Sequence, residues 1–300
     1  MKLNNIKIVL GLGLAFMLGS CSNSDELLTP NSERVAVKVA ADFTSLSSTE
    51  EDGNWNANSM VGLTMMDKEE ANILLNAFNF NYTTPDGTIN FQPISEENTA
   101  YFPQDGSEVA IKAYHPYNKE LTKDQKLPVT VKDQSNLVAI DYMTAEHLEG
   151  FSKTDSAVKL HFKHRMAKLI FNISLDDKNQ TIPLKDFKLE MSGMKTTGVY
   201  DILAEALAIN EESAEDIVVP SNDKDDNREA IVLPREAGEG VSFKFTTEKG
   251  DTYVAKMSPE LKLEAGYQYT FNIKLQAIPL TVSATVEEWK EGPKSDLIAQ

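Results

Sequence analysis

Apolar side chains recur at every second residue in several short stretches of the chain. This period of two is typical of a β-strand with one buried face, because successive side chains of a strand point to opposite faces of its sheet. Stretches of this kind span residues 35–39, 78–82, 109–113, 158–162, 169–173, 241–245 and 267–273. The pattern therefore predicts a protein built mainly from β-strands.

Turn signals separate these stretches. The residues TPDG, at 84–87, lie between the alternating stretch that ends at residue 82 and a second short run at 88–92. Proline and glycine in this arrangement favour a tight turn, so we predict a β-hairpin here. Several short strands with turns between them indicate an all-β sandwich rather than a parallel α/β sheet. The best candidate for a short helix is 201–217, where the spacing of apolar residues is mixed.

The strands fall into two groups. A polar, glycine-containing segment at 146–157 separates them. We predict an N-terminal β-sandwich domain over residues 35–150 and a C-terminal β-sandwich domain over residues 151–300. Both lengths are ordinary for single domains.

The beginning of the chain has a different pattern. A basic start with two lysines precedes an apolar run over residues 8–18, and two small residues then lead to Cys21, the only cysteine of the chain. The run is shorter than the about 20 apolar residues that a permanent transmembrane helix needs. It has the length of the hydrophobic part of a secretory signal. We therefore predict a signal peptide over residues 1–20.

This arrangement resembles the lipobox of bacterial lipoproteins, in which a leucine, here Leu18, stands three residues before the cysteine. The resemblance implies that the thiol of Cys21 is joined to diacylglycerol and that its amino group is acylated with a fatty acid such as palmitate. A thiolate is the side-chain nucleophile that suits such alkylation, and several acyl chains anchor a protein far more firmly than one. An ordinary signal peptide with an incidental cysteine is the alternative.

The residues after Cys21 indicate a location for the protein in the cell envelope. Ser22 is not the aspartate that typically retains lipoproteins in the inner membrane, and SDE at 24–26 resembles the acidic tag that exports lipoproteins to the cell surface in Bacteroidales-type bacteria. The polar, proline-containing segment 21–34 is typical of a tether. We therefore expect a surface-exposed protein of the outer membrane, attached through lipid on Cys21.

The net charge of the chain limits the classes of molecule that it can bind. The chain contains 46 acidic residues against 29 lysines and arginines, a net charge of −17, and the loss of residues 1–20 with their two lysines makes it −19. Such a field repels nucleic acid and anionic lipid headgroups. We expect no nucleic acid partner.

The sequence offers little support for catalysis or metal binding. His161 and His164 form the motif HFKH, but residues three apart on a strand point to opposite faces. The other two histidines are His115 and His147, and the ordinary interpretation of each is a satisfied or exposed residue. No serine lies in a G-x-S-x-G elbow and no glycine-rich phosphate loop occurs. We expect no enzymatic activity, no cofactor and no metal site.

The two tryptophans leave two interpretations open. Trp55 and Trp289 are each flanked by polar, turn-prone residues. We expect them to pack at the edges of the sandwich. A role as platforms for stacking against sugar rings is the alternative, because exposed β-proteins use aromatic side chains in this way.

Five segments, in chain order, resemble the sequence blocks of Bacteroidales-type fimbrillins, which are pilin-like surface lipoproteins. They are WNANSMVGL (55–63), YFPQDGSEVAIKAYHPY (101–117), VKLHFKHRMAKLIFNI (158–173), LEAGYQYTFNIKL (263–275) and ATVEEWKEG (284–292). The third is the most recognisable signature of the family. One departure is Ser59, which stands where the family usually has an acidic residue. The resemblance covers nearly the whole chain after the tether.

The resemblance implies two tandem transthyretin-like β-sandwich domains and assembly into a fimbria by strand exchange. In that mode an extended segment of one subunit fills a groove in the next, so other fimbrial subunits would be the partners. In polymerising members an arginine-specific protease removes the N-terminal segment, which opens the groove and frees the subunit from its lipid. Arg34 is the only arginine before residue 165, so it is the candidate cleavage site, with Val35 as the new N terminus. The alternative is that Arg34 is simply a charged residue at the start of a strand.

The end of the chain bears on the role within a fimbria. The residues after Trp289 are KEGPKSDLIAQ, in which Pro293 cannot donate to a ladder. The remaining DLIAQ is short for a donor strand, which would need the roughly 9–10 residues of a long sheet strand. This favours a tip, anchor or accessory component over a stalk subunit. Two functions stay open: a fimbrial component that supports adhesion, and a surface lipoprotein of the same fold that binds a glycan or a host ligand.

Overall fold

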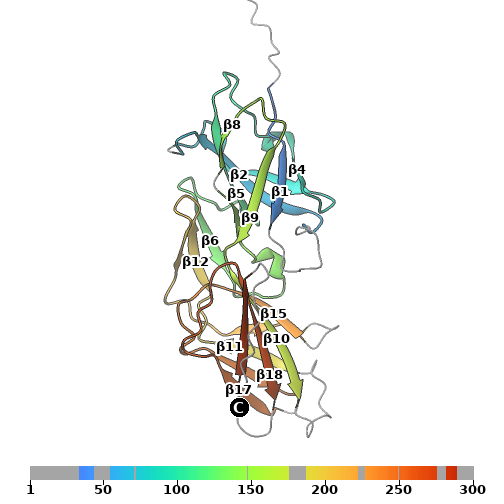
Figure 1. The fold of residues 1–300 in the computed structure, drawn as a ribbon, viewed down its shortest axis with the longest axis vertical. Helices are drawn as coiled ribbons and strands as arrows, with labels where there is room; N and C mark the ends of the chain where they lie inside the picture. The colour runs from blue at the N-terminus through green and yellow to red at the C-terminus, as the bar shows by residue number, and fades with distance from the viewer. Residues whose placement is uncertain are drawn as a thin grey trace, which may run out of the picture. The chain divides into compact units, whose positions relative to one another are not determined.

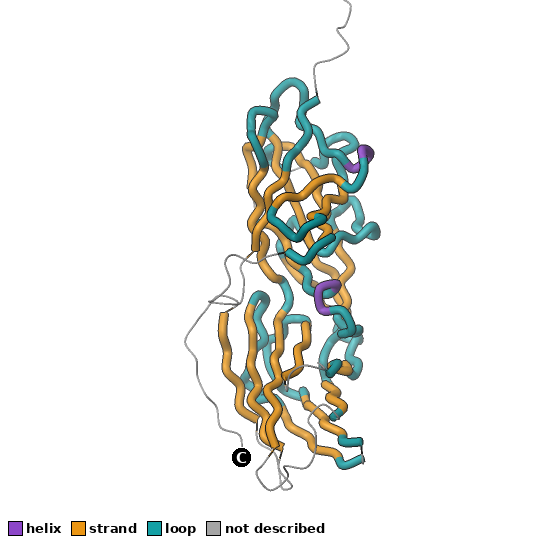
Figure 2. Tube along the Cα trace, turned by 90° about the vertical axis from the view of Figure 1, so that its right-hand side faces the viewer, coloured by secondary structure: helices purple, strands orange, loops and turns teal. Residues whose placement is uncertain are grey.

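The computed structural model describes residues 34–43, 55–70, 72–146, 148–175, 187–221, 227–248, 250–275 and 282–288. Within these ranges the chain forms nineteen strands and two 3-10 helices, Glu96–Asn98 and Leu137–Ala139 (Figure 1). Figure 2 shows that strands and the loops between them make up nearly all of the described chain. The compact unit that contains the strands begins at Val35. The prediction of an all-β protein is confirmed.

The first sheet has eight strands in the order β2-β3-β4-β1-β9-β7-β5-β8, and a further pairing of β2 with β5 closes seven of them into a ring. The strands are β1 (Val39–Phe43), β2 (Ser59–Asp67), β3 (Phe80–Thr84), β4 (Asn90–Pro93), β5 (Val109–His115), β7 (Met143–Ala145), β8 (Leu148–Phe151) and β9 (Val158–His164). Alternate side chains of these strands, such as Leu63 and Phe162, form a buried core.

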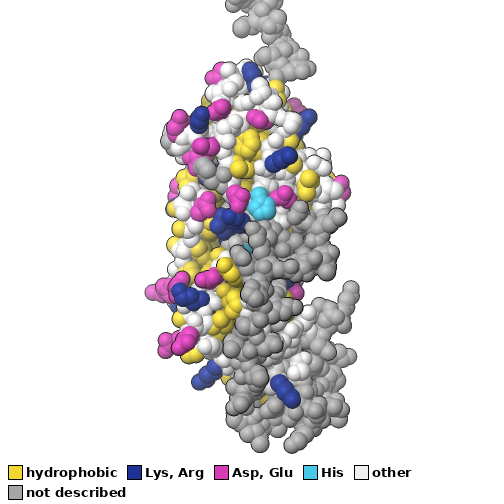
Figure 3. Space-filling model, viewed as in Figure 1, with side chains coloured by type: hydrophobic (Ala, Val, Ile, Leu, Met, Phe, Trp, Pro, Cys, Tyr) yellow, Lys and Arg dark blue, Asp and Glu magenta, His cyan; other side chains and the backbone are white. Residues whose placement is uncertain are grey.

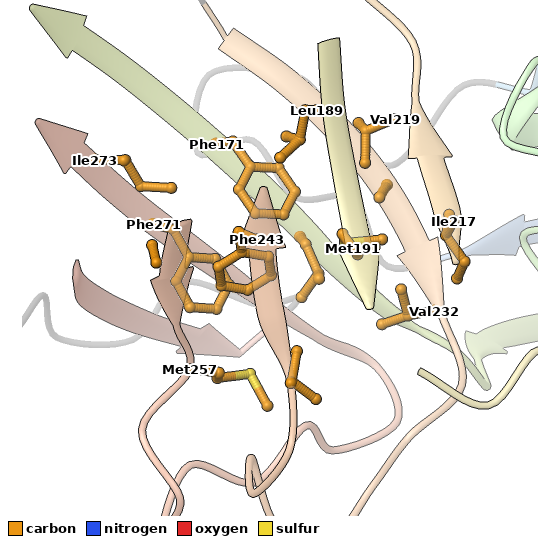
Figure 4. Packing of buried hydrophobic residues seen from close by; sticks show 14 of the residues in the cluster. Phe171, Leu189, Met191, Ile217, Val219, Val232, Phe243, Met257, Phe271 and Ile273 are labelled. Atoms are coloured by element: carbon orange, nitrogen blue, oxygen red, sulfur yellow. The ribbon is translucent and has the colours of Figure 1, made fainter. Parts of the chain in front are cut away.

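Two four-stranded sheets, of orders β15-β10-β18-β19 and β14-β11-β16-β17, enclose a second core. Their strands are β10 (Ala167–Leu175), β11 (Lys188–Ser192), β14 (Ile217–Val219), β15 (Asn227–Val232), β16 (Ser242–Thr246), β17 (Thr252–Lys256), β18 (Tyr267–Leu275) and β19 (Val282–Glu288). Phe171 stacks on Phe271 with ring centroids 5.5 Å apart, and Phe243 lies edge-on to Phe171 at 5.2 Å (Figure 4). Burial of each such ring contributes roughly 1.5–3 kcal/mol to stability.

A third sheet joins early and late parts of the chain. It has the order β13-β12-β6, where β6 is Lys126–Thr130, β12 is Thr197–Asp201 and β13 is Ala206–Ile209. A third buried cluster lies against it and includes Leu127 from β6 and Tyr200 from β12. This shared sheet and cluster tie residues of the first half of the chain to residues of the second.

Two predictions about local structure have opposite outcomes. The hairpin around TPDG is confirmed, because β3 and β4 pair in antiparallel fashion on either side of it. The helix over 201–217 is wrong, since the segment forms a turn followed by β13. The Asp201 carboxylate accepts hydrogen bonds from the backbone N–H groups of Leu203 and Ala204, at 3.0 and 2.9 Å, and this local bonding favours a turn over a helix.

The predicted division into domains at residues 150 and 151 stays a prediction. Strand β9 follows that point in the sequence and lies in the first sheet, between β1 and β7. The chain then enters the second set of sheets at β10. In the described part of the chain the change of sheet therefore falls between His164 and Ala167.

Candidate functional site

The first strand of the compact unit occupies an unusual position. β1 lies between β4 and β9 (Figure 1). It pairs with β9 in parallel over five residues, from Val39 opposite Val158 to Phe43 opposite Phe162, and with β4 over only two. β1 therefore forms its longest continuous ladder with β9.

The other edge is completed by short backbone contacts and by two side chains. The N–H of Val37 donates to the carbonyl oxygen of Ala100 at 2.9 Å, and the N–H of Ala41 donates to that of Ile89 at 2.7 Å. The hydroxyl of Tyr82 donates to the carbonyl oxygen of Val37 over 3.2 Å and accepts from the N–H of Ala100 at 3.1 Å. The indole Nε1 of Trp55 donates to the carbonyl oxygen of Ala41 over 2.8 Å. Buried backbone carbonyls need a donor, and the short strand β4 leaves these two without a ladder partner. Burial of the Tyr82 hydroxyl raises its pKa to about 12, so it stays a donor at physiological pH.

Apolar contacts complete the docking of this segment. Val37, Val39 and Ala41 point into the first core and are all 3% exposed or less. Burying them contributes roughly 1.5–3 kcal/mol for each valine. The same segment is linked to the chain around Ala100 by a β-bridge between Ala36 and Tyr101.

Trp55 is a core residue. Its ring is surrounded by Phe43 at 4.8 Å, Phe91 and His115 at 5.1 Å and Phe162 at 5.4 Å between centroids, and it is 5% exposed. The expectation that it packs at a sandwich edge is wrong, and so is its alternative role as an exposed sugar platform. The hydrogen bond to β1 explains why a tryptophan rather than a phenylalanine stands there. Trp289 lies outside the described residues.

The histidines serve separate contacts. His161 and His164 face opposite sides of β9, as predicted. Nδ1 of His161 lies 2.6 Å from the Asp42 carboxylate of β1, and Nδ1 of His164 lies 2.8 Å from that of Asp141. His115 is buried, which lowers its pKa, and its Nδ1–H donates to the carbonyl oxygen of Met60 at 2.9 Å. His147 lies outside the described residues, and among those that are described no group of three or more potential ligands could hold a metal ion.

Arg34 and Val35 lie at the exposed start of the compact unit. The carbonyl oxygen of Val35 accepts a hydrogen bond from the N–H of Phe102 at 3.0 Å. The Arg34–Val35 peptide bond therefore lies where the polar tether meets ordered structure. Cys21 and the signal peptide over 1–20 lie outside the described residues. No helix in the described ranges is long and apolar enough to cross a membrane.

The residues that dock β1 have no recognisable signal in the sequence. Tyr82 belonged to an alternating stretch and Asp42 to no motif, so neither carried a signal of its own. Only the pairing of β1 with a strand far along the chain reveals their roles. On the face drawn in space-filling form, basic side chains are dispersed among the acidic ones, so the excess of acid does not form one continuous acidic surface there (Figure 3).

The chain is similar in sequence and in fold to several known proteins. A sequence model of the family described as "Fimbrillin-like" matches residues 48–289. The chain is 26% identical over 294 residues, 95% of both proteins, to a Bacteroides uniformis protein described as "Putative fimbrium subunit Fim1C". It is also similar to two crystal structures described as putative cell adhesion proteins. One, from Bacteroides uniformis, has a TM-score of 0.72 and 26% identity, with 87% of this chain and 100% of the other covered. The second, from Bacteroides ovatus, has a TM-score of 0.68 at 18% identity, with coverages of 89% and 99%, and supports the fold alone.

Proposed function

Because the chain belongs to the fimbrillin-like family, we propose that it is a non-enzymatic component of surface fimbriae that supports adhesion. The observation that carries the proposal is the docking of β1, a short strand of the first sheet. It forms one continuous five-residue ladder with β9, whereas its other edge is held by short, separate contacts with β4, Ile89 and the segment 100–102. A groove occupied by one short extended segment is a suitable acceptor for an equivalent segment of another subunit.

The proposal includes the finer architecture. The ring of strands around the first core and the pair of sheets around the second would be two tandem transthyretin-like sandwiches. Support comes from the separation of the two cores, whose buried side chains come from different sheets. In this proposal the third sheet, β13-β12-β6, connects the two sandwiches.

We further propose that Cys21 carries lipid and anchors the protein on the outer face of the outer membrane. The lipobox pattern, the SDE tag and the tether up to Arg34 support this. The fact that the compact unit begins at Val35 gives the tether a defined length. A lipid-anchored protein with such a tether has room to stand clear of the membrane surface.

In this proposal, cleavage after Arg34 removes the tether but not β1. β1 and its docking residues follow Arg34 in the chain, so a cut there releases the tether and leaves β1 in its groove. Between Val35 and Arg165 the sequence contains no arginine at which a second cut by the same protease would free β1. We therefore do not expect cleavage after Arg34 to open the groove by itself. A donor strand would have to displace β1.

The test is the N terminus of the protein in surface-sheared fimbriae, measured by mass spectrometry. We expect peptides that begin at Val35 and retain residues 35–43. Intact acylated Cys21 in every molecule would exclude cleavage for this chain while leaving the anchor or tip role open. Absence of the chain from the fimbrial fraction, in cells that display it on their surface, would exclude the fimbrial role.

Binding of a glycan or host ligand is the second candidate function. One basis for this candidate function was that a sugar could stack on Trp55. The burial of Trp55 removes that basis. A tip component that contacts a ligand directly would combine both functions.

A further inference from the structure

A cleft of about 750 Å³ lies beside the third sheet. It is lined by β13 and β12 together with the segment 233–239, which follows β15. Arg165 and Ala265, from the starts of β10 and β18, complete the lining. The volume is in the range of about 300–1,000 Å³ that is typical of ligand sites.

The charges in the cleft are arranged by depth. The charged lining residues are Arg165, Lys195, Arg235, Glu205, Glu211, Glu236 and Glu239. The Arg165 side chain is 17% exposed, whereas those of Glu211 and Glu236 are 81% and 91% exposed. The cationic groups therefore lie deeper than the carboxylates. Two of them already have a partner in the cleft, because Arg165 pairs with Glu205 at 3.1 Å and Lys195 with Glu211 at 3.5 Å.

Arg235 is the group that most clearly calls for an anion. Its Nη1 donates to the carbonyl oxygen of Gly193 and its Nη2 to that of Glu239, both at 3.0 Å, and its Nε donates to that of Ala237. In the described part of the chain no carboxylate lies within 4.0 Å of its guanidinium. Burial lowers the pKa of Arg235 although the charge of Glu211 acts to raise it, so that carboxylate only partly offsets the burial of the guanidinium. A carboxylate entering the cleft would supply that counter-ion.

One wall of the cleft suits an extended peptide. Leu207 and Ile209 of β13 line it, with Met194 and Leu233 nearby. β13 is an edge strand and, within the described ranges, pairs only with β12. A free strand edge is a template for another extended segment. The aromatic residue of the lining, Tyr200, is 3% exposed, so the cleft offers no open ring for a sugar to stack on.

We propose that this cleft binds residues 295–300 of the same chain, the sequence SDLIAQ. Asp296 supplies the carboxylate for Arg235, and Leu297 and Ile298 supply the apolar side chains for the wall of β13. Lys294 matches the acidic rim. The segment lies outside the described residues, and the proposal does not depend on a fimbrial role.

The position and length of the chain agree with this occupant. β19 ends at Glu288, which pairs with Tyr267, and Ala265 of the cleft lies two residues before that tyrosine. The eight residue steps from Glu288 to Asp296 span at most about 26–29 Å. Neighbouring strands lie about 4.8 Å apart, so the tail starts within reach of the cleft. Gly292 and Pro293 are residues that favour the turn needed to direct it there.

The test is disulfide trapping in the full chain with Cys21→Ser, which removes the native thiol. Ile209→Cys together with Leu297→Cys should form an intramolecular disulfide on mild oxidation with diamide, seen by mass spectrometry and by mobility on a non-reducing gel. A second pair, Ala237→Cys with Leu297→Cys, probes the opposite lining in case the first site does not tolerate the change. Asp296→Asn should slow trapping by up to about fivefold, the effect of one ion pair.

The matched control is Val199→Cys with Leu297→Cys. Val199 is exposed on β12, and its backbone pairs beside that of Ile209, but its side chain is on the opposite face of the sheet from Tyr200 and the cleft. Trapping at Ile209 at least about tenfold faster than at Val199 supports the proposal. Equal rates at both positions, no trapping with either cleft pair, or exclusively intermolecular disulfides would overturn it.

Discussion

The hydroxyl of Tyr82, on β3, donates a hydrogen bond to the carbonyl oxygen of Val37, just before β1, although β3 and β1 are not neighbours in the sheet. The tyrosine reaches past the short strand β4 and takes the place of a missing ladder bond. The attachment of the first segment therefore depends on individual side chains as well as on the backbone. Substitution of these side chains can therefore test how β1 is docked.

Replacing Tyr82 with phenylalanine keeps the ring and removes the hydroxyl. The carbonyl oxygen of Val37 and the N–H of Ala100 then lose their buried partner, so we expect a loss of about 1–3 kcal/mol in the free energy of unfolding. Urea denaturation followed by circular dichroism measures it. Tyr253→Phe is the control, because its hydroxyl makes no comparable buried bond, and a similar loss there would contradict the role assigned to Tyr82.

Trp55 should behave as an interior fluorophore. In a Trp289→Phe variant the emission of Trp55 should be blue-shifted and weakly quenched by iodide, because the indole is 5% exposed. Trp55→Ala should cost about 3–5 kcal/mol through the cavity it leaves. Strong iodide quenching of a folded Trp289→Phe protein would show that the ring is accessible.

Acidification should destabilise the protein through His115. Burial lowers the pKa of this histidine in the folded state, so the unfolded chain binds a proton more readily than the folded one. The stabilising contribution is complete above the unfolded pKa of about 6.5 and is lost as pH falls below it, with a slope of at most about 1.4 kcal/mol per pH unit. Unfolding titrations at pH 7.5, 6.5 and 5.5 should show a smaller slope for His115→Gln than for the unsubstituted protein; equal slopes would exclude His115 as the cause.

Gly62 permits a close approach between β2 and β5. A Cβ atom placed there would lie 2.1 Å from Cε1 of Tyr114 and 2.8 Å from Oδ1 of Asn79. The Tyr114 hydroxyl is bonded to Asn79 and to the Asn118 carbonyl, so the ring has little freedom to move. Gly62→Ala should therefore cost about 1–3 kcal/mol or more. Gly150→Ala serves as the comparison in the same thermal denaturation assay. No atom lies within 4 Å there, so its cost is only the backbone strain of a φ of +84°, about 1–2 kcal/mol, and it should lose less stability than Gly62→Ala.

A disulfide that fixes β1 tests strand displacement. Asp42 and His161 are register partners on β1 and β9, so Asp42→Cys with His161→Cys should close a disulfide across the parallel ladder. If a donor strand displaces β1, the fixed protein should be absent from sheared fimbriae and should return after treatment with a reductant. Asp42→Cys alone should assemble normally. Assembly of the oxidised double variant would exclude displacement of β1.

Periodicity revealed most of the strands because burial of one face is a local property. Val158, Leu160 and Phe162 alternate with polar residues, and their strand lies where the alternation predicts it. The spacing of apolar residues gave a wrong prediction for the segment after Asp201. Its leucines and alanines have helical propensity, but the Asp201 side chain bonds its own backbone and pairing with β12 then favours an extended chain.

The docking of the first strand could not be predicted in the same way. Trp55 has polar neighbours in sequence, which suggested the surface, yet its indole is fixed by Ala41 and by three aromatic side chains from other strands, together with the ring of His115. The cleft beside β13 also has no local signature, since its charged residues come from several separate segments. Both features are products of long-range pairing. The roles of Cys21 and Arg34 stay predictions, made from residues in one short part of the sequence.

The parallel pairing of β1 with β9 also constrains biogenesis. Asp42 and His161 touch although 119 residues separate them, and contacts of such sequence separation form slowly because a large loop must close first. β1 is synthesised long before its partner. The ring of the first sheet closes only after the chain has been made as far as His164, so until then the apolar face of β1 has no complete core to pack into.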